Sequence, residues 1–364
     1  MKKILFLTNI PSPYRVSFFN ELGKACQLTV GFEGHYATDR NKNWQTEQVQ
    51  YFTPIFLNGW RWRADAFWSF QILKLLRQYW DCIIISGYST PTSMLAIEYM
   101  RLRKIPFCLE VDGGLIRSDN KLKFWLKKHF ISAAYGWFSS GKETTKYLTH
   151  YGANPTKIYE YPFTSLLEKD ILPQVPTLEQ KQALRRQLGI TEEKVLISVG
   201  QFIHRKGYDI LLHAAAQLPK NMGIYIIGDH PTAEYLALQK NLHLEQVHFV
   251  GFQSKEELKK WYWAADAFVL PTREDIWGLV INEAMAQGLP IITTDRCVAG
   301  LELVKEGENG YIVPIEDVQA LSQAITKIFA QDYRAMGQKS LERIRPYTIE
   351  NMASRHLEVF NGNI

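Results

Sequence analysis

The sequence predicts an α/β protein with two doubly wound parallel sheets. Short apolar runs rich in β-branched residues alternate with helical stretches along the chain, and buried parallel strands joined by crossover helices have this pattern. The length of 364 residues suits two domains better than one core. Four scattered cysteines without a Cys-x-x-Cys pair exclude a disulfide scaffold and a cysteine zinc site.

Nine clear apolar runs are predicted to be strands. We expect the functional loops to follow them, because ligands bind outside the carboxyl ends of the strands in such sheets. The predicted strands are Ile4–Thr8, Leu28–Gly31, Cys82–Ser86, Phe107–Val111, Val195–Val199, Gly223–Ile227, Val247–Val250, Ala267–Leu270 and Ile291–Thr293.

The alternation pauses between about residues 162 and 194, where we place the domain boundary. Thr177, with Gln180 three residues later, predicts a capped helix start, and Gly189 stands where such a helix would end. A second unit of strand, glycine and helix starts at Val195. The sequence therefore predicts one domain over residues 1–165 and another over residues 166–346.

The positive charge lies in the first half of the chain. Residues 1–170 hold 22 Lys and Arg against 14 Asp and Glu, a net charge of +8. Residues 171–364 hold 20 against 23, a net charge of −3. This asymmetry predicts that the first domain meets an anionic surface or substrate.

We expect a cytoplasmic location. No apolar run approaches the ~18–20 residues of a membrane span. The apolar run after Lys2 and Lys3 stops at Thr8, which is too short for the ~7–15-residue core of a signal peptide. The scattered cysteines fit a reducing compartment.

Two adjacent cations follow the predicted strand Val195–Val199. Arg205 and Lys206 lie on the loop before the next helix, at the edge of the sheet where phosphates bind. A guanidinium can bind two phosphate oxygens, and an ammonium acts as a point charge. These residues alone leave two interpretations open, a phosphate site or a pair of solvated loop cations.

A second loop places carboxylates beside a potential anion site. A helix is predicted from about Trp277 to Gln287, and its amino end offers unpaired N–H groups and a positive dipole. Gly278 permits a ligand to approach the backbone. Asp275 and Glu283 can accept hydrogen bonds from the hydroxyls of a ribose and a hexose near one diphosphate. Alternatively, Glu283 faces solvent and Asp275 is an N-terminal charge.

The segment from Val195 to Glu316 resembles the nucleotide-sugar-binding half of the retaining glycosyltransferases of family 4. The resemblance implies the GT-B fold, in which two Rossmann-like domains face each other across a cleft. It also implies that a last helix, at about residues 347–364, packs back on the first domain. The matching pieces are "VGQFIHRKGYDILLHAAAQL", "YIIGD", "VHFVGFQSKEEL", "ADAFVLPTREDIWGLVINEAMAQGLPII" and "GENGYIVP".

The resemblance implies how the donor diphosphate is bound. Arg205 and Lys206 would neutralise it, and the backbone of Gly278 and Leu279 would meet the phosphates. The family often has an Arg after the strand glycine, where this chain has Gln201.

The resemblance also implies which residues bind the ribose, the sugar and the base of the donor. Glu283 would take the ribose hydroxyls, and Asp275, with Glu274 beside it, the hydroxyls of the donor sugar. The family usually has Glu where this chain has the shorter Asp275. Gly228 would line the nucleotide cleft, and Phe252 would lie near the base.

The first domain supplies candidates for the acceptor side. Arg15 follows the first strand and either reaches the donor phosphates or the acceptor, or is a structural arginine of the first helical turn. Gly87 and Tyr88 follow another strand on the cleft side. Asp112 follows Phe107–Val111, where many relatives have a His-Asp pair, and is the candidate for orienting or deprotonating the acceptor hydroxyl.

Two basic stretches with interleaved aromatics, Asn120–Ser132 and Gly59–Trp80, are typical of helices that bind an anionic membrane. Helices that pack on their own sheet and expose a basic edge to solvent would have a similar sequence pattern. No recognition motif supports nucleic acid as a partner.

We expect no metal and no cofactor. The chain has no Asp-x-Asp, His-Glu-x-x-His or Gly-x-Gly-x-x-Gly motif. The expected function is transfer of a sugar, with retention, from a nucleoside-diphosphate sugar to a glycan or lipid-linked acceptor, in cell-surface polysaccharide synthesis. The alternatives are a sugar-nucleotide 2-epimerase of the same fold and a catalytically silent sugar- or lipid-binding module.

Overall fold

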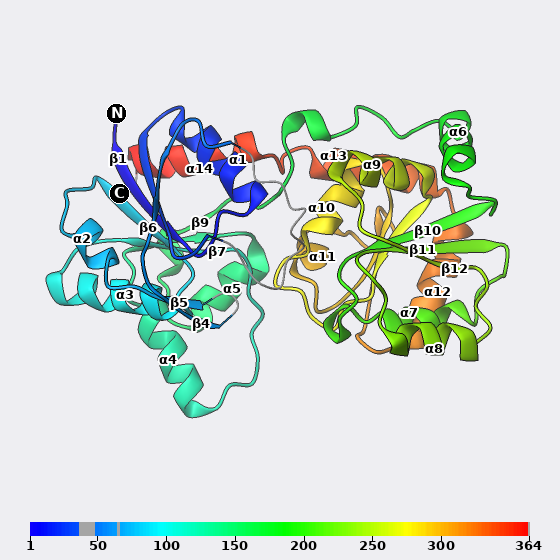
Figure 1. Ribbon diagram of the computed structural model, residues 1–364, viewed down its shortest axis with the longest axis horizontal. Helices are drawn as coiled ribbons and strands as arrows, with labels where there is room; N and C mark the ends of the chain where they lie inside the picture. Colours follow the sequence, from blue (N-terminus) through cyan, green and yellow to red (C-terminus); the bar gives the residue numbers. More distant parts are fainter. Residues whose placement is uncertain (36–47, 64–65, 363–364) are drawn as a thin grey trace. The chain divides into compact units, whose positions relative to one another are not determined.

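The computed structural model describes residues 1–35, 48–63 and 66–362, which form two compact units (Figure 1). The amino-terminal unit comprises Met1–Ser165 and Tyr347–Ile364, and the carboxyl-terminal unit comprises Leu166–Pro346. The chain therefore builds the first unit, then the second, and returns to the first with its last helix.

The amino-terminal unit is built on a parallel sheet. Among the described residues it has seven strands in the order β3-β2-β1-β6-β7-β8-β9. The order turns back at β1, so that β1 and β6 form the switch point where doubly wound sheets bind ligands. The strands are β1 (Lys3–Thr8), β2 (Gln27–Phe32), β3 (Thr53–Phe56), β6 (Cys82–Ser86), β7 (Cys108–Val111), β8 (Gly136–Ser139) and β9 (Ile158–Glu160).

Helices cover both faces of this sheet, because alternate residues of a strand point to opposite faces. Leu109 and Val111 of β7 pack against α2 to α5, whereas Glu110 points toward α1 and α14 on the other face (Figure 1). The helices are α1 (Pro13–Gly23), α2 (Ile72–Leu76), α3 (Pro91–Arg103), α4 (Lys121–Ile131), α5 (Lys142–His150) and α14 (Ile349–Gly362), with a 3-10 turn at Pro155–Lys157.

The carboxyl-terminal unit repeats this architecture. Its parallel sheet has the order β12-β11-β10-β13-β14-β15 among the described residues, which places a second switch point between β10 and β13. The strands are β10 (Lys194–Val199), β11 (Met222–Ile227), β12 (Val247–Val250), β13 (Ala267–Leu270), β14 (Ile291–Thr294) and β15 (Gly310–Val313).

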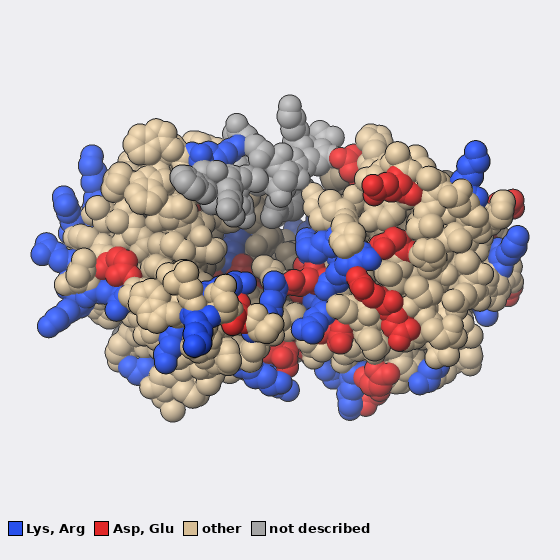
Figure 2. Space-filling view, turned by 90° about the horizontal axis from the view of Figure 1, so that it is seen from below, with Lys and Arg blue, Asp and Glu red and all other residues tan. Residues whose placement is uncertain are grey.

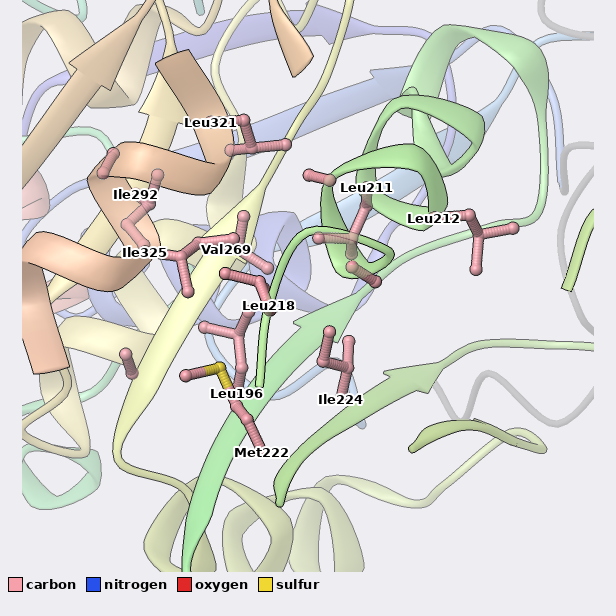
Figure 3. Packing of buried hydrophobic residues seen from close by; sticks show 14 of the residues in the cluster. Leu196, Leu211, Leu212, Leu218, Met222, Ile224, Val269, Ile292, Leu321 and Ile325 are labelled. Carbon is pink, nitrogen blue, oxygen red and sulfur yellow. The ribbon is translucent and has the colours of Figure 1, made fainter. Parts of the chain in front are cut away.

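The core of this unit lies between the sheet and one layer of helices. Figure 3 shows side chains of β10, β11, β13 and β14 meeting those of α7 and α12. Helices α9, α10 and α11 lie on the opposite face (Figure 1). The helices are α6 (Leu178–Leu188), α7 (Tyr208–Ala215), α8 (Ala233–Asn241), α9 (Lys255–Ala264), α10 (Leu279–Ala286), α11 (Val298–Leu303), α12 (Val318–Phe329) and α13 (Tyr333–Ile344), with 3-10 turns at Glu168–Asp170 and His204–Lys206.

One basic aromatic stretch is not a long helix. Residues 59–80 contain the antiparallel pair β4 (Trp60–Arg63) and β5 (Ala66–Trp68), and then only the short α2. Aromatic residues favour strands, which explains the hairpin. The other stretch, Asn120–Ser132, does form a helix, α4, whose first turn is capped by the side chain of Asn120.

The predicted capping of α6 is confirmed. The Thr177 side chain accepts from the backbone N–H of Gln180, the Gln180 side chain accepts from that of Thr177, and Gly189 ends the helix at φ 71°. Each interaction satisfies a backbone group that the end of a helix leaves unpaired.

Helix α6 is held to the sheet by a buried ionic cluster. Arg185 Nη2 lies 2.6 Å from Asp266 Oδ2, and Lys181 Nζ lies 3.3 Å from Asp266 Oδ1. Asp266 is 2% exposed and also accepts from the backbone N–H of Val195 at 2.9 Å. This carboxylate therefore ties α6 to the start of β10 within the carboxyl-terminal unit.

We predict that Asp266→Ala lowers the free energy of unfolding by about 3–5 kcal/mol, because the substitution leaves two buried cations without their counter-ion. Urea unfolding followed by circular dichroism measures the change. Glu257→Ala, which removes an exposed pair with Lys260, is the control and should cost less than about 1 kcal/mol. Equal losses in the two variants would contradict this account of Asp266.

Candidate functional site

The predicted site residues of the carboxyl-terminal unit follow four adjacent strands. Arg205 and Lys206 follow β10, and Asp275 and Gly278 follow β13. Gly228 comes directly after β11, and Phe252 follows β12. Because all four strands are parallel, these loops share the carboxyl edge of the sheet, around the switch point between β10 and β13.

The two cations and one predicted acid meet at this edge. Lys206 Nζ lies 2.5 Å from Asp275 Oδ2, and both residues are 9% exposed. Arg205 Nη1 lies 3.4 Å from Asp275 Oδ1 and donates to the Glu274 carbonyl at 2.8 Å. The Arg205 side chain is 46% exposed, so it has room to move toward a ligand.

Arg273 fixes the loop that carries the cations, and sequence reasoning did not single it out. It donates through Nη1 to the His204 carbonyl at 2.7 Å and through both Nη atoms to the Asp209 carboxylate. Its Nε donates to Glu316 at 2.8 Å. Hydrogen bonding to Asp209 raises the pKa of Arg273 above its ordinary value, so the guanidinium stays charged.

The helix after this loop starts later than predicted. Helix α10 begins at Leu279 rather than at about Trp277, because Gly278 adopts φ 102° and Trp277 belongs to the preceding turn. A Cβ at Gly278 would lie 2.8 Å from Cys297 Sγ, so a side chain has no space there. Glycine is therefore required here both by the positive φ and by the close packing on Cys297.

Glu283 is half-buried on α10 rather than on a fully solvated face. The hydroxyl of the buried Tyr262 donates to its Oε2 at 3.4 Å. Burial and then the Glu283 charge raise the pKa of the Tyr262 hydroxyl, so Tyr262 remains a donor and holds the carboxylate.

Gly228 and Phe252 line the same edge further along. A Cβ at Gly228 would lie 2.2 Å from the Gly200 carbonyl oxygen, because the ends of β10 and β11 approach closely. Phe252 is 40% exposed on the loop between β12 and α9, so its ring is available for stacking.

The predicted residues of the amino-terminal unit also gather at a carboxyl edge. Arg15 lies in α1 after β1, Gly87 and Tyr88 follow β6, and Asp112 follows β7. Gly87 adopts φ 87° and donates its N–H to the Glu110 carbonyl at 2.9 Å. A glycine meets this left-handed turn without strain.

The sequence leaves Arg15 either as a residue that reaches the donor or acceptor, or as a structural arginine. Its surroundings in the structure are those of a structural arginine. It is 2% exposed. Its Nη1 lies 2.8 Å from Glu110 Oε2, and its Nη2 lies 2.5 Å from Asp112 Oδ1 and donates to Ser86 at 2.9 Å. The guanidinium is therefore an internal counter-ion for two carboxylates.

The two carboxylates have opposite pKa shifts although they share one arginine. Burial opposes the ionised form of Glu110, but the charge of Arg15 and the nearby His356 outweigh it and lower the pKa to about 2. Burial raises the pKa of Asp112, and the negative charge of Glu110 raises it further, against the pull of Arg15. Such a separation is typical of acid–base pairs.

Tyr88 is held by a second tyrosine. Its hydroxyl is hydrogen-bonded to the hydroxyl of Tyr147 on α5. Burial and then the neighbouring Tyr147 raise the pKa of Tyr88, so Tyr88 acts as a neutral hydrogen-bonding group.

In residues 1–35, 48–63 and 66–362, no three or more His, Cys, Asp and Glu side chains gather at metal-binding distance. In the same residues, the structure contains no helix with the length and apolarity needed to cross a membrane.

Sequence comparisons match the carboxyl-terminal unit. Residues 180–350 match the family model "Glycosyl transferases group 1". The lipopolysaccharide core biosynthesis glycosyltransferase LpsE of Rhizobium meliloti is 33% identical over 140 residues, 38% of this chain and 40% of its own. The D-inositol 3-phosphate glycosyltransferase of Corynebacterium urealyticum is 32% identical over 195 residues, 49% of this chain and 45% of its own. This chain thus spans less than half the length of either relative.

Structural comparisons cover almost the whole chain. HepE of Anabaena in complex with UDP has a TM-score of 0.78 at 16% identity, over 98% of this chain and 99% of HepE. Sucrose-phosphate synthase of Thermosynechococcus elongatus has a TM-score of 0.77 at 20% identity, over 99% and 98%. These similarities confirm the predicted GT-B fold.

The predicted resemblance to GT-B glycosyltransferases is confirmed: residues 180–350 of this chain match the glycosyl transferases of group 1.

Proposed function

We propose that this chain transfers a sugar, with retention of configuration, from a nucleoside-diphosphate sugar to a hydroxyl of a glycan or lipid-linked acceptor. The observation that carries this is the meeting of Lys206, Arg205 and Asp275 at the switch point of the carboxyl-terminal sheet. The similarity to enzymes named for lipopolysaccharide biosynthesis supports a role in cell-surface polysaccharide synthesis.

In this proposal the carboxyl-terminal unit binds the donor. Negative charge develops on the leaving diphosphate as the bond to the sugar breaks. Lys206, Arg205 and the amide groups at the start of α10, by Gly278 and Leu279, supply fixed positive potential there. Cations and amides can stabilise this charge without a metal ion, so we expect transfer to proceed without one.

The same edge offers groups for the rest of the donor. Glu283, held by Tyr262, would accept from the ribose hydroxyls. Asp275, with Glu274 beside it, would accept from the donor sugar, and Lys206 would then exchange its Asp275 partner for the diphosphate. The exposed ring of Phe252 would stack near the base, beyond the close approach at Gly228.

The amino-terminal unit would bind the acceptor. Asp112 is the one carboxylate of the Arg15 cluster whose side chain reaches the surface, at 24% exposed, whereas Glu110 is fully buried. It would orient or deprotonate the acceptor hydroxyl. Gly87 and Tyr88 lie beside it on the same edge and would contact the acceptor.

The exposed side chains of α4 support our further proposal that the chain associates with an anionic membrane on its cytoplasmic face. Leu122, Trp125 and Leu126 are 67%, 57% and 40% exposed at helical spacing, and Lys121, Lys123 and Lys128 flank them along the helix. Figure 2 shows mostly blue among the charged side chains of the amino-terminal unit, at the left, and mixed blue and red at the right. Basic helices with exposed aromatics bind anionic lipid.

We predict that Lys206→Ala lowers the turnover of a nucleotide sugar by about 100-fold, the typical effect of removing one group that stabilises developing charge. Release of nucleoside diphosphate measures the turnover, and unchanged circular dichroism shows that the fold is intact. Lys220→Ala, at an exposed lysine before β11, is the matched control. Unchanged kinetics in Lys206→Ala would refute the role of the cation.

We predict that one class among UDP-, GDP- and ADP-sugars raises the melting temperature of the protein by mass action. Thermal unfolding at increasing ligand concentration measures the shift. Stabilisation by a nucleotide sugar without any release of nucleoside diphosphate would favour the binding module instead, and a changed sugar configuration in the released product would favour the epimerase.

We predict that the protein co-sediments with phosphatidylglycerol vesicles at low salt and less at high salt, because the attraction is partly electrostatic. Replacing Leu122 and Trp125 together by Ser should reduce the bound fraction. Leu102→Ser removes an exposed leucine from α3 and is the control. Equal recovery in the pellet with and without vesicles would rule out membrane binding.

A further inference from the structure

One buried hydroxyl group near the end of β10 lacks a hydrogen-bond partner. Tyr208, the first residue of α7, is fully buried, and among the described residues no atom forms a hydrogen bond with its hydroxyl. Its ring packs in the core, with a centroid distance of 5.4 Å to the ring of Phe202. Buried polar groups without a partner are rare, because each one costs free energy. Packing alone therefore does not explain why this residue is a tyrosine.

The hydroxyl lies beside the lysine of the candidate donor site. A Cβ at Gly200, the residue after β10, would lie 2.9 Å from the Tyr208 hydroxyl oxygen and 3.4 Å from Lys206 Cε. The hydroxyl and the lysine side chain thus meet at the same point, which is open to both because Gly200 has no side chain. This point lies at the carboxyl edge of the sheet, where Lys206 pairs with Asp275.

The ammonium group of Lys206 has more donors than it uses. It carries three N–H groups, and within the described part of the chain its one hydrogen bond goes to Asp275 Oδ2 at 2.5 Å. In the proposed exchange, a phosphate oxygen of the donor takes the place of Asp275. Two N–H groups then remain for acceptors in the protein.

The Tyr208 hydroxyl is suited to accept one of these hydrogen bonds. Burial, and to a smaller extent the charge of Asp275, raises the pKa of the hydroxyl, so it stays neutral and its oxygen can accept. A neutral acceptor holds an ammonium in place and leaves its charge to the phosphate. A carboxylate in the same position would neutralise that charge.

We propose that Tyr208 is a positioning residue for the donor: when Lys206 leaves Asp275 for the diphosphate, the Tyr208 hydroxyl accepts a hydrogen bond from the ammonium and holds it against the phosphates. While Lys206 is paired with Asp275, the hydroxyl has no partner, so its hydrogen bond favours the donor-bound arrangement specifically. This inference rests on the proposed role of Lys206 in donor binding.

The test uses Tyr208→Phe, which removes only the hydroxyl oxygen. Calorimetry gives the dissociation constants for UDP, GDP and ADP, and circular dichroism gives the melting temperature. We expect the tightest of the three nucleotides to bind about tenfold more weakly, the effect of losing one hydrogen bond to a charged group. Without nucleotide the melting temperature should stay the same or rise, because replacing an unpartnered buried hydroxyl by hydrogen removes a cost.

Tyr225→Phe is the matched control. Tyr225 of β11 is also a buried tyrosine of the carboxyl-terminal unit, but its hydroxyl donates to Glu192 at 2.8 Å. The control should therefore give the opposite pattern, a lower melting temperature with unchanged nucleotide affinity.

Lys206→Ala tests whether the hydroxyl acts through the lysine. If it does, Tyr208→Phe should weaken binding no further once the ammonium is gone. The rise in melting temperature at millimolar nucleotide, which also detects weak binding, compares the two backgrounds. An equal further loss in the Lys206→Ala background, an unchanged dissociation constant in Tyr208→Phe alone, or failure of that variant to fold would overturn the proposal.

The unmodified protein and Lys206→Ala separate this inference from the proposed function. Nucleotide binding that Lys206→Ala weakens and Tyr208→Phe leaves unchanged would overturn the positioning role alone. Absence of binding of all three nucleotides to the unmodified protein would count against the proposed donor site and, with it, against the role of Tyr208.

Discussion

The ion pair between Lys206 and Asp275 is the interaction on which the carboxyl-terminal site depends. Its atoms lie 2.5 Å apart and are nearly buried, so each charge offsets the cost of burying the other. The pair exists only because β10 and β13 are neighbours whose loops emerge at one edge. A diphosphate that binds here, as proposed, would compete with a carboxylate already in place.

The amino-terminal unit also buries ionised side chains beside counter-ions, but with different residues. Two carboxylates share Arg15, and His356 joins from the end of the chain. Both units therefore place ionised groups at a switch point of a parallel sheet, where strand ends diverge and backbone groups are accessible. In the proposed function, the cations of one unit would meet the leaving group, and the carboxylate of the other unit would meet the acceptor hydroxyl.

Local sequence patterns predicted most of the fold, because apolar strands and capped helices are encoded by neighbouring residues. The capping box at Thr177 and Gln180 is one example. The predicted start of α10 is wrong by two residues, since Asp275 and Trp277 pair through their carbonyls with the backbone N–H groups of Val298 and Ala299, far along the chain. Long-range pairs such as Arg273 with Glu316 and Glu110 with His356 left no local signal. The burial of Arg15 was likewise one of two open alternatives until the fold placed both carboxylates beside it.

In the proposed function, a nucleoside diphosphate binds at the carboxyl edge of β10 and β13. A crystal structure of the protein soaked with the nucleoside diphosphate of its stabilising sugar nucleotide tests it most directly. We expect phosphate oxygens within hydrogen-bond distance of Lys206 Nζ and the amides at Gly278, with Asp275 released from the lysine. A diphosphate bound elsewhere, with the ion pair of Lys206 and Asp275 undisturbed, would contradict the account.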